Sequence, residues 1–101
     1  MTTEGGPDSE RGKAFFDRAD AIVALANAQA QEVPPEDVSA SLLFAASRYH
    51  AFITAARAHN AENMQAARDG VVDYFLGQYR MMLLDNLDDY IRNFPAYMGR
   101  G

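Results

Sequence analysis

Arg48 is the residue whose type and position most need a chemical explanation. Between Asp37 and Arg57 it is the only fully charged residue, in a stretch that is otherwise largely apolar. A charge in such surroundings is costly unless it is paired or its long side chain reaches water. We therefore expect Arg48 to pair with a carboxylate, from Asp73 or from residues 85–89, or to lie at the rim of an interface.

A second interpretation gives Arg48 a ligand. A guanidinium between helices can hold an anionic group, and the side chains around it can add apolar and hydrogen-bonding contacts. In this interpretation the chain is a bundle that binds a small anionic or apolar ligand, and the predicted binding set is Arg48, Tyr49, His50, Phe52 and Tyr79. Both interpretations of Arg48 stay open at the level of the sequence.

The candidates for metal binding are a histidine–glutamate pair and an acidic cluster. His59 and Glu62 are three residues apart and can share one side of a helix, but the chain has no Glu-x-x-His motif of the kind found in di-iron bundles. A zinc site needs three or four converging ligands. Asp85, Asp88 and Asp89 lack the spacing of a calcium loop, so we interpret them as a solvated helix face. We predict no metal site and no cofactor.

No constellation in the sequence supports catalysis or nucleic-acid binding. The chain has no cysteine and no Gly-x-Ser-x-Gly motif, and Ser39 and Ser41 lie at a helix start, where capping and close packing explain them. The net charge is −5, and the nine basic residues are scattered, whereas phosphate backbones require clustered positive charge. We predict a protein that is not an enzyme and has no nucleic-acid partner.

The start of the chain and its apolar runs bear on location. Residues 1–9 contain Gly5, Gly6 and Pro7 and predict a flexible arm. The first 13 residues lack the apolar stretch of a secretory signal, and no uncharged run approaches the ~20 residues of a membrane span. We therefore expect a cytoplasmic protein without a membrane partner.

Two helices are predicted in the first 58 residues. From Lys13 the apolar positions recur with the period of an α-helix, which should begin after Asp8 or Ser9 and end near Glu32, ahead of Pro34. A second helix should run from Pro35 or Glu36 to about Ala58. Its main apolar face consists of Val38, Leu42, Ala45, Ala46, Tyr49, Phe52, Ile53 and Ala56.

The second helix is apolar on its other side as well. Leu43 and Phe44 point well away from the main face, among Ala40, Ala51 and Ala55. A helix that is apolar nearly all round is buried nearly all round, and two neighbouring helices can hardly cover all of it. The sequence therefore predicts contact with another subunit through Leu43, Phe44, Arg48 and Ala51. This prediction depends on Leu43 and Phe44 being covered by residues outside their own chain.

The last part of the chain predicts a third helix with two apolar faces. Asn60 is the expected N-cap, and one face consists of Met64, Val71, Val72, Phe75, Tyr79, Met82 and Leu83. The apolar residues from Leu84 onward cluster about 100° further round. Because Asn86 can cap a new helix, we expect a break near Asp85–Asn86, a short fourth helix that ends at Phe94, and a loose tail. Gly70 and Gly77 suggest close approach of another helix.

Three blocks of the sequence resemble a known family. They are FFDRADAIVALANAQ (15–29), VSASLLFAASRYHAF (38–52) and YFLGQYRMMLLDNLDDYIRNF (74–94). They are similar to a family of small bacterial proteins catalogued only as a domain of unknown function, and the similarity covers about residues 14–98. The resemblance implies a small helical cytoplasmic protein, and it assigns no catalytic or binding residue.

These observations predict an all-α fold in a single domain over residues 10–98, followed by a loose tail at 99–101. Three main helices would form a bundle, with a short fourth helix. The predicted function is a non-enzymatic module that self-associates, or docks a protein partner, through helix 36–58, most simply as a homodimer. The small-ligand bundle centred on Arg48 is the alternative.

Overall fold

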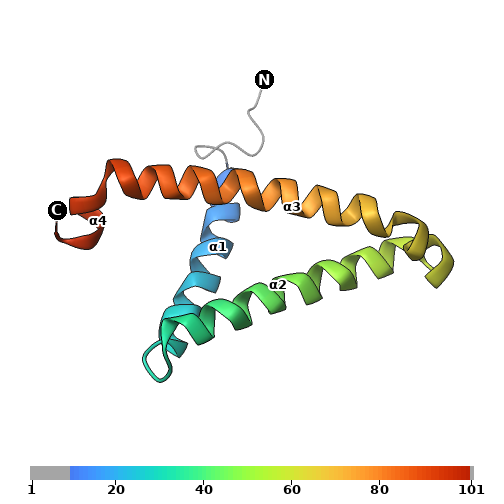
Figure 1. Cartoon of the computed structure of the whole chain (residues 1–101), viewed down its shortest axis with the longest axis horizontal. Helices are drawn as coiled ribbons and strands as arrows, with labels where there is room; N and C mark the ends of the chain where they lie inside the picture. Colours follow the sequence, from blue (N-terminus) through green and yellow to red (C-terminus); the bar gives the residue numbers. More distant parts are fainter. Residues whose placement is uncertain (1–9, 101) are drawn as a thin grey trace. The chain divides into compact units, whose positions relative to one another are not determined.

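The computed structural model describes residues 10–100, and these residues form four helices without any strand. They are α1 (Glu10–Gln29), α2 (Pro35–Ala58), α3 (Ala61–Arg92) and α4 (Phe94–Met98) (Figure 1). The predicted all-α class is confirmed. The chain divides into two units at Ala51 and Phe52, inside α2, and each is described by itself below. The predicted arm at residues 1–9 lies outside the described residues.

The first unit contains α1 and the first part of α2. The helix α1 ends at Gln29, three residues before the predicted end at Glu32, because the chain tightens into turns there. The Gln31 and Glu32 amides donate to carbonyls three residues earlier, at 3.2 and 3.0 Å. The start of α2 at Pro35 agrees with the prediction, since proline at the first helical position loses no intrahelical hydrogen bond.

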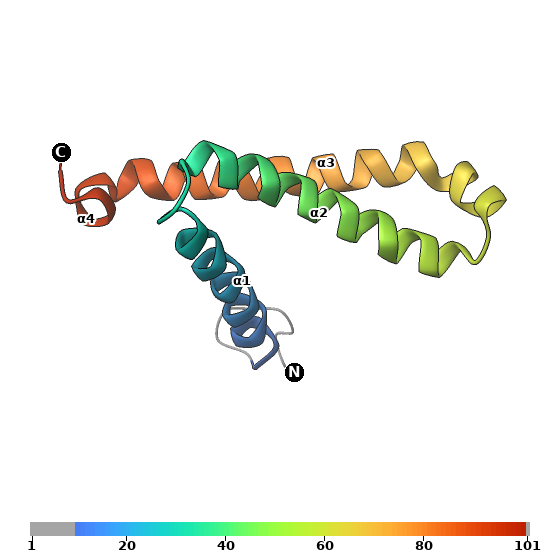
Figure 2. The same cartoon turned by 90° about the horizontal axis from the view of Figure 1, so that it is seen from below.

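The second unit shows that α3 is continuous, so the break predicted at Asp85–Asn86 is wrong. Figures 1 and 2 show one uninterrupted helix from Ala61 to Arg92. The Asn86 side-chain amide donates to the Met82 carbonyl at 2.9 Å, as a residue inside a helix does, and does not cap a new one. The change of apolar face near Leu84 therefore belongs to one straight element with two apolar sides.

The short fourth helix lies later in the chain than predicted. It runs from Phe94 to Met98, where a loose tail was expected, and Pro95 lies in its first turn. Proline is tolerated there because the amide it lacks would have no partner. The helix ends at Gly99, whose φ of 69° is left-handed and whose amide donates to the Pro95 carbonyl at 2.8 Å.

Apolar burial in the described residues is slight. Val38 is the only buried hydrophobic residue among residues 10–100. In the second unit the half-buried side chains come from the end of α2 and from the first face of α3, and they include Ile53, Thr54, Ala58, Met64, Val71 and Phe75. Neither Gly70 nor Gly77 has an atom within 4 Å of an added Cβ, so the close approach suggested for them is not made by the described residues of the second unit.

Because α3 is continuous, Asn86→Ala and Asn60→Ala should change the free energy of unfolding in opposite directions. Asn86→Ala should raise the free energy of unfolding by a few tenths of a kcal/mol, because alanine is the better residue inside a helix. Asn60→Ala, at the true N-cap, should lower it by about 1 kcal/mol. Urea unfolding followed by circular dichroism measures both. A loss of about 1 kcal/mol in Asn86→Ala would mean that Asn86 caps a helix after all.

Candidate functional site

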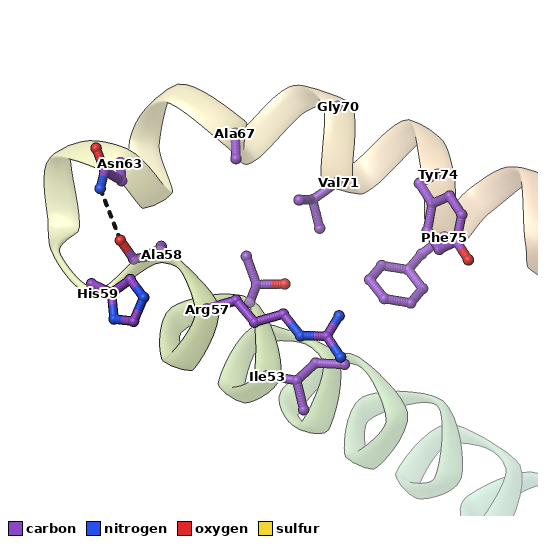
Figure 3. Close-up of a pocket in the computed structure, with 11 residues that line it drawn as sticks. Ile53, Arg57, Ala58, His59, Asn63, Ala67, Gly70, Val71, Tyr74 and Phe75 are labelled. Atoms are coloured by element: carbon purple, nitrogen blue, oxygen red, sulfur yellow. Dashed lines mark hydrogen bonds between the residues drawn. The ribbon is translucent and has the colours of Figure 1, made fainter.

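The best-defined local geometry is the corner between α2 and α3. It consists of His59 and Asn60, and the side chains of Asn60 and Asn63 form hydrogen bonds on both sides of it. Figure 3 shows the hydrogen bond from Asn63 to Ala58. The Asn60 carboxamide oxygen accepts from the Asn63 amide at 2.7 Å, and the Asn63 side chain donates to the Ala58 carbonyl at 2.9 Å. One cap thus serves the start of α3 and the other the end of α2. Local hydrogen bonds alone define this turn.

His59 has the left-handed backbone that such a corner requires. Its φ is 72°, and it is the only non-glycine residue with positive φ among residues 10–100. Its amide donates to the Ala55 carbonyl at 3.2 Å, which ends α2 in the usual left-handed manner. A residue with a Cβ costs about 1–2 kcal/mol in this conformation. The histidine therefore stores strain at the corner.

A groove of about 670 Å³ opens beside this corner. Figure 3 shows Ala67, Val71 and Phe75 pointing from α3 toward the end of α2, with Arg57 extending along the space from α2. The complete lining is Ile53, Thr54, Arg57, Ala58, His59, Asn63, Ala67, Gly70, Val71, Tyr74 and Phe75. The groove thus combines a mainly apolar wall with one fixed positive charge, so it could hold an apolar group next to an anionic one.

The predicted interaction residues all lie on exposed parts of α2. Leu43 is 61% exposed and Phe44 is 67% exposed, so the described residues of the first unit do not enclose them. Ala51 and Arg48 are exposed too, and Arg48 forms no ion pair with a carboxylate of residues 10–51. The expected partners Asp73 and residues 85–89 belong to the other unit, so that pairing stays a prediction. Exposure does not single out α2, because all four helices expose large apolar side chains.

The predicted ligand-binding set is divided between the two units, and its assembly stays a prediction. Arg48, Tyr49 and His50 belong to the first unit, and Phe52 and Tyr79 to the second. None of these five residues lines the groove at the corner, where the basic residues are Arg57 and His59. The sequence analysis missed this groove. Asn60 and Asn63 indicate a tight corner by their capping hydrogen bonds, but no residue pattern indicates the groove beside it.

The acidic residues near the end of α3 have a structural use. Asp89 accepts a hydrogen bond from the Tyr97 hydroxyl at 2.8 Å and from the Asn93 side-chain amide at 2.9 Å. The Tyr97 ring stacks on Tyr90, with centroids 4.4 Å apart and planes 25° apart. We call Asp89, Tyr90, Asn93 and Tyr97 the C-terminal cluster. It fixes α4 against the end of α3.

Asp89 also alters the acidity of its partner. The hydrogen bond to Asp89 and the negative charge of its carboxylate raise the pKa of Tyr97 above the usual 10.0, because both favour the protonated phenol.

Across residues 10–100 no three histidine or acidic side chains converge as metal ligands would. None of the described helices is long and apolar enough to cross a bilayer.

Comparison with known proteins gives one match. Residues 15–91 match the family described as a protein of unknown function (DUF3144). The chain belongs to this family. The match confirms the resemblance seen in the sequence, includes most of α1, all of α2 and α3 up to Ile91, and leaves α4 outside. No curated protein and no solved structure matches the chain.

The strain at His59 predicts that its replacement stabilises the protein. His59→Gly should raise the free energy of unfolding by about 1 kcal/mol, because glycine adopts positive φ without steric cost. His50→Gly, inside α2, is the matched control and should lower it by about the same amount. Urea titration gives both values. If both variants lowered the free energy of unfolding equally, the imidazole of His59 would stabilise the fold by more than its backbone strain costs.

The Asp89–Tyr97 hydrogen bond predicts a pH dependence. Because the folded pKa of Tyr97 is raised, the stabilisation is complete below about pH 10, the unfolded pKa, and is lost as pH rises through the folded pKa. Asp89→Asn should lower the pKa of Tyr97 toward 10.0, as followed by NMR titration of the assigned tyrosine ring. Asp88→Asn is the control for the loss of one charge, and an equal effect in both would contradict the specific bond.

Proposed function

We propose that this protein is a non-enzymatic helical module that associates with itself. In the proposed form the three long helices close into a bundle, and the far side of α2 pairs with a second copy in a homodimer. The observation that carries the proposal is the exposure of large apolar side chains on every helix, against one buried hydrophobic residue in the described part of the chain. A soluble domain must cover such faces with other helices.

The geometry of α2 explains why part of this cover should come from another molecule. At 100° per residue, Phe44, Arg48 and Ala51 fall within about 60° of arc, centred about 130° from the middle of the main face. A bundle of three helices gives α2 two neighbours, and both pack toward its main face. The arc around Phe44 combines a large ring with a small side chain that admits a close neighbour. Arg48 at its edge suits the rim of an interface, where a guanidinium keeps access to water.

A small-ligand function is the second candidate, and the corner groove favours it. Its volume lies within the range of small-molecule sites, and its wall is mainly apolar. The cation that lines the groove is Arg57 and not Arg48. The groove therefore supports the binding of a small ligand in general, but at other residues than the sequence predicted. The groove is also wide open to solvent, which supports a covering helix more than an enclosed small molecule.

The oligomeric state tests the leading proposal. Sedimentation velocity of the full chain at micromolar concentration should show a dimer, and native mass spectrometry should give twice the chain mass without an added ligand. Phe44→Ser should weaken the dimer at least tenfold, because it removes a buried ring at the centre of the interface. Circular dichroism of each variant shows whether the helices are retained.

Leu25→Ser is the matched control. Leu25 is 60% exposed on α1 and lies off the apolar face of that helix, so its loss should leave the dimer unchanged. A monomer at all concentrations tested would contradict self-association. A dimer that withstands Phe44→Ser would place the interface elsewhere, and a bound small molecule in the native spectrum would favour the second candidate.

A further inference from the structure

The C-terminal half of α3 carries a second apolar face with the spacing of a coiled coil. Leu76, Arg80, Leu83, Leu87 and Tyr90 are separated by four, three, four and three residues. This is the a/d pattern of a helix that packs along one other helix. We call these five residues the C-terminal seam. Leu84 and Ile91 flank it on one side and widen its apolar surface.

The seam is distinct from the face that α3 turns toward α2. Within the second unit, Met64, Val71 and Phe75 are half-buried, and Figure 3 shows Val71 and Phe75 directed to the end of α2. The seam is centred about 90° further round the helix than the predicted first face and shares only Leu83 with it. There Leu76 is 63% exposed and Leu87 is 50% exposed. The two faces of α3 therefore require two different partners.

Helix lengths show that α2 cannot cover the end of the seam. The helices have 24 and 32 residues, or about 36 and 48 Å at 1.5 Å per residue. Because a two-residue corner joins them, any antiparallel packing of α2 on α3 runs out near Leu84. Residues 85–92 extend beyond that limit.

We propose that the C-terminal seam pairs with the seam of a second copy, antiparallel and about a two-fold axis. Arg80 decides the orientation. In a parallel pair the two Arg80 side chains would face each other at a core position, where like charges repel. An antiparallel pair centred on residue 85 places Arg80 against the partner's Tyr90 and Leu83 against the partner's Leu87. The two arginines are then about 15 Å apart along the axis.

The surroundings of Tyr90 and Gly77 fit this register. Tyr97 stacks on one side of the Tyr90 ring and is itself bound to Asp89, so the ring is held with its other side available to a guanidinium. Gly77 destabilises the helix relative to alanine and has open space around it in the single chain. In the proposed pair Gly77 lies two residues, about 3 Å along the axis, from the position opposite the partner's Ile91, and a small residue there makes room for a large one.

Charge elsewhere on this segment agrees with the pairing. Asp85, Asp88, Asp89 and Arg92 lie on the side of α3 away from the seam, at 100° per residue. Pairing of the seams therefore buries Arg80 alone among the charged residues of this segment, and it gives Arg80 an aromatic partner. The inference rests on the proposed self-association and assigns it a second surface, apart from Phe44.

Disulfide trapping tests the register, because the chain has no native cysteine to interfere. Gly77→Cys and Ile91→Cys chains are prepared separately, mixed and oxidised. The mixture should give a disulfide-linked dimer, and either variant alone should not, because the two copies of residue 77 lie about 24 Å apart along the axis of the antiparallel pair and the two copies of residue 91 about 18 Å apart. Cross-linking of each variant with itself, or none in the mixture, would overturn the register.

Charge reversal provides a second, independent test on the full chain. Arg80→Glu should weaken the dimer at least tenfold in sedimentation velocity, because the partner's Tyr90 loses its cation. Arg92→Glu makes the same charge change on the opposite side of α3 and should leave the dimer unchanged. A dimer that withstands Arg80→Glu but is lost in Phe44→Ser would overturn this inference and keep the proposed function. A wild-type chain that is monomeric throughout would overturn both.

Discussion

The removal of apolar helix faces from water is the constraint on which this structure depends. Isolated helices are marginal in water, and most of their stability in proteins comes from packing of an apolar face. Here α2 and α3 have 24 and 32 residues, yet Val38 is the only buried hydrophobic residue among those described. The helices therefore need other helices to pack against before they are stable, and in the proposed dimer folding and association are coupled. In such a protein the unfolding midpoint rises with protein concentration.

The corner between α2 and α3 is the exception, since it is specified locally. Asn60, Asn63 and His59 form it through hydrogen bonds within a few residues of one another, without contribution from a distant element. The C-terminal cluster has the same character, because Asp89, Asn93 and Tyr97 are separated by four residues each. These two features fix the direction of the chain at each end of α3. Neither feature covers the apolar faces of α3, which need contacts with other helices.

This distinction also explains what could be predicted from the sequence. The start of α2 at Pro35 and the cap at Asn60 follow from local chemistry, and both agree with the structure. The break at Asn86 was wrong because a rotation of the apolar face was taken for a change of direction. In fact Asn86 bonds back to Met82 inside a continuous helix. The fourth helix was misplaced because Pro95 was taken as a stop, whereas it lies in the first turn.

The candidate site was harder to predict for a related reason. Hydrophobic periodicity shows that a face needs cover, but it does not show which element supplies it. Arg48 was singled out as a lone charge among apolar residues, yet the same argument applies to Arg80, which lies at a core position of a coiled-coil pattern. The groove beside Arg57 arises from the angle between two helices at a corner, and no residue pattern encodes that angle directly.

Two self-pairing surfaces on one chain limit the assemblies that can form. A single surface that pairs with its own copy closes a dimer with two-fold symmetry. If the arc around Phe44 and the C-terminal seam each pair in this way at separate sites, the second pairing joins dimers to one another. The result closes as a tetramer with three perpendicular two-fold axes, or it continues as an open chain. A discrete homodimer therefore requires that both surfaces share one two-fold axis, so that a single partner covers them together.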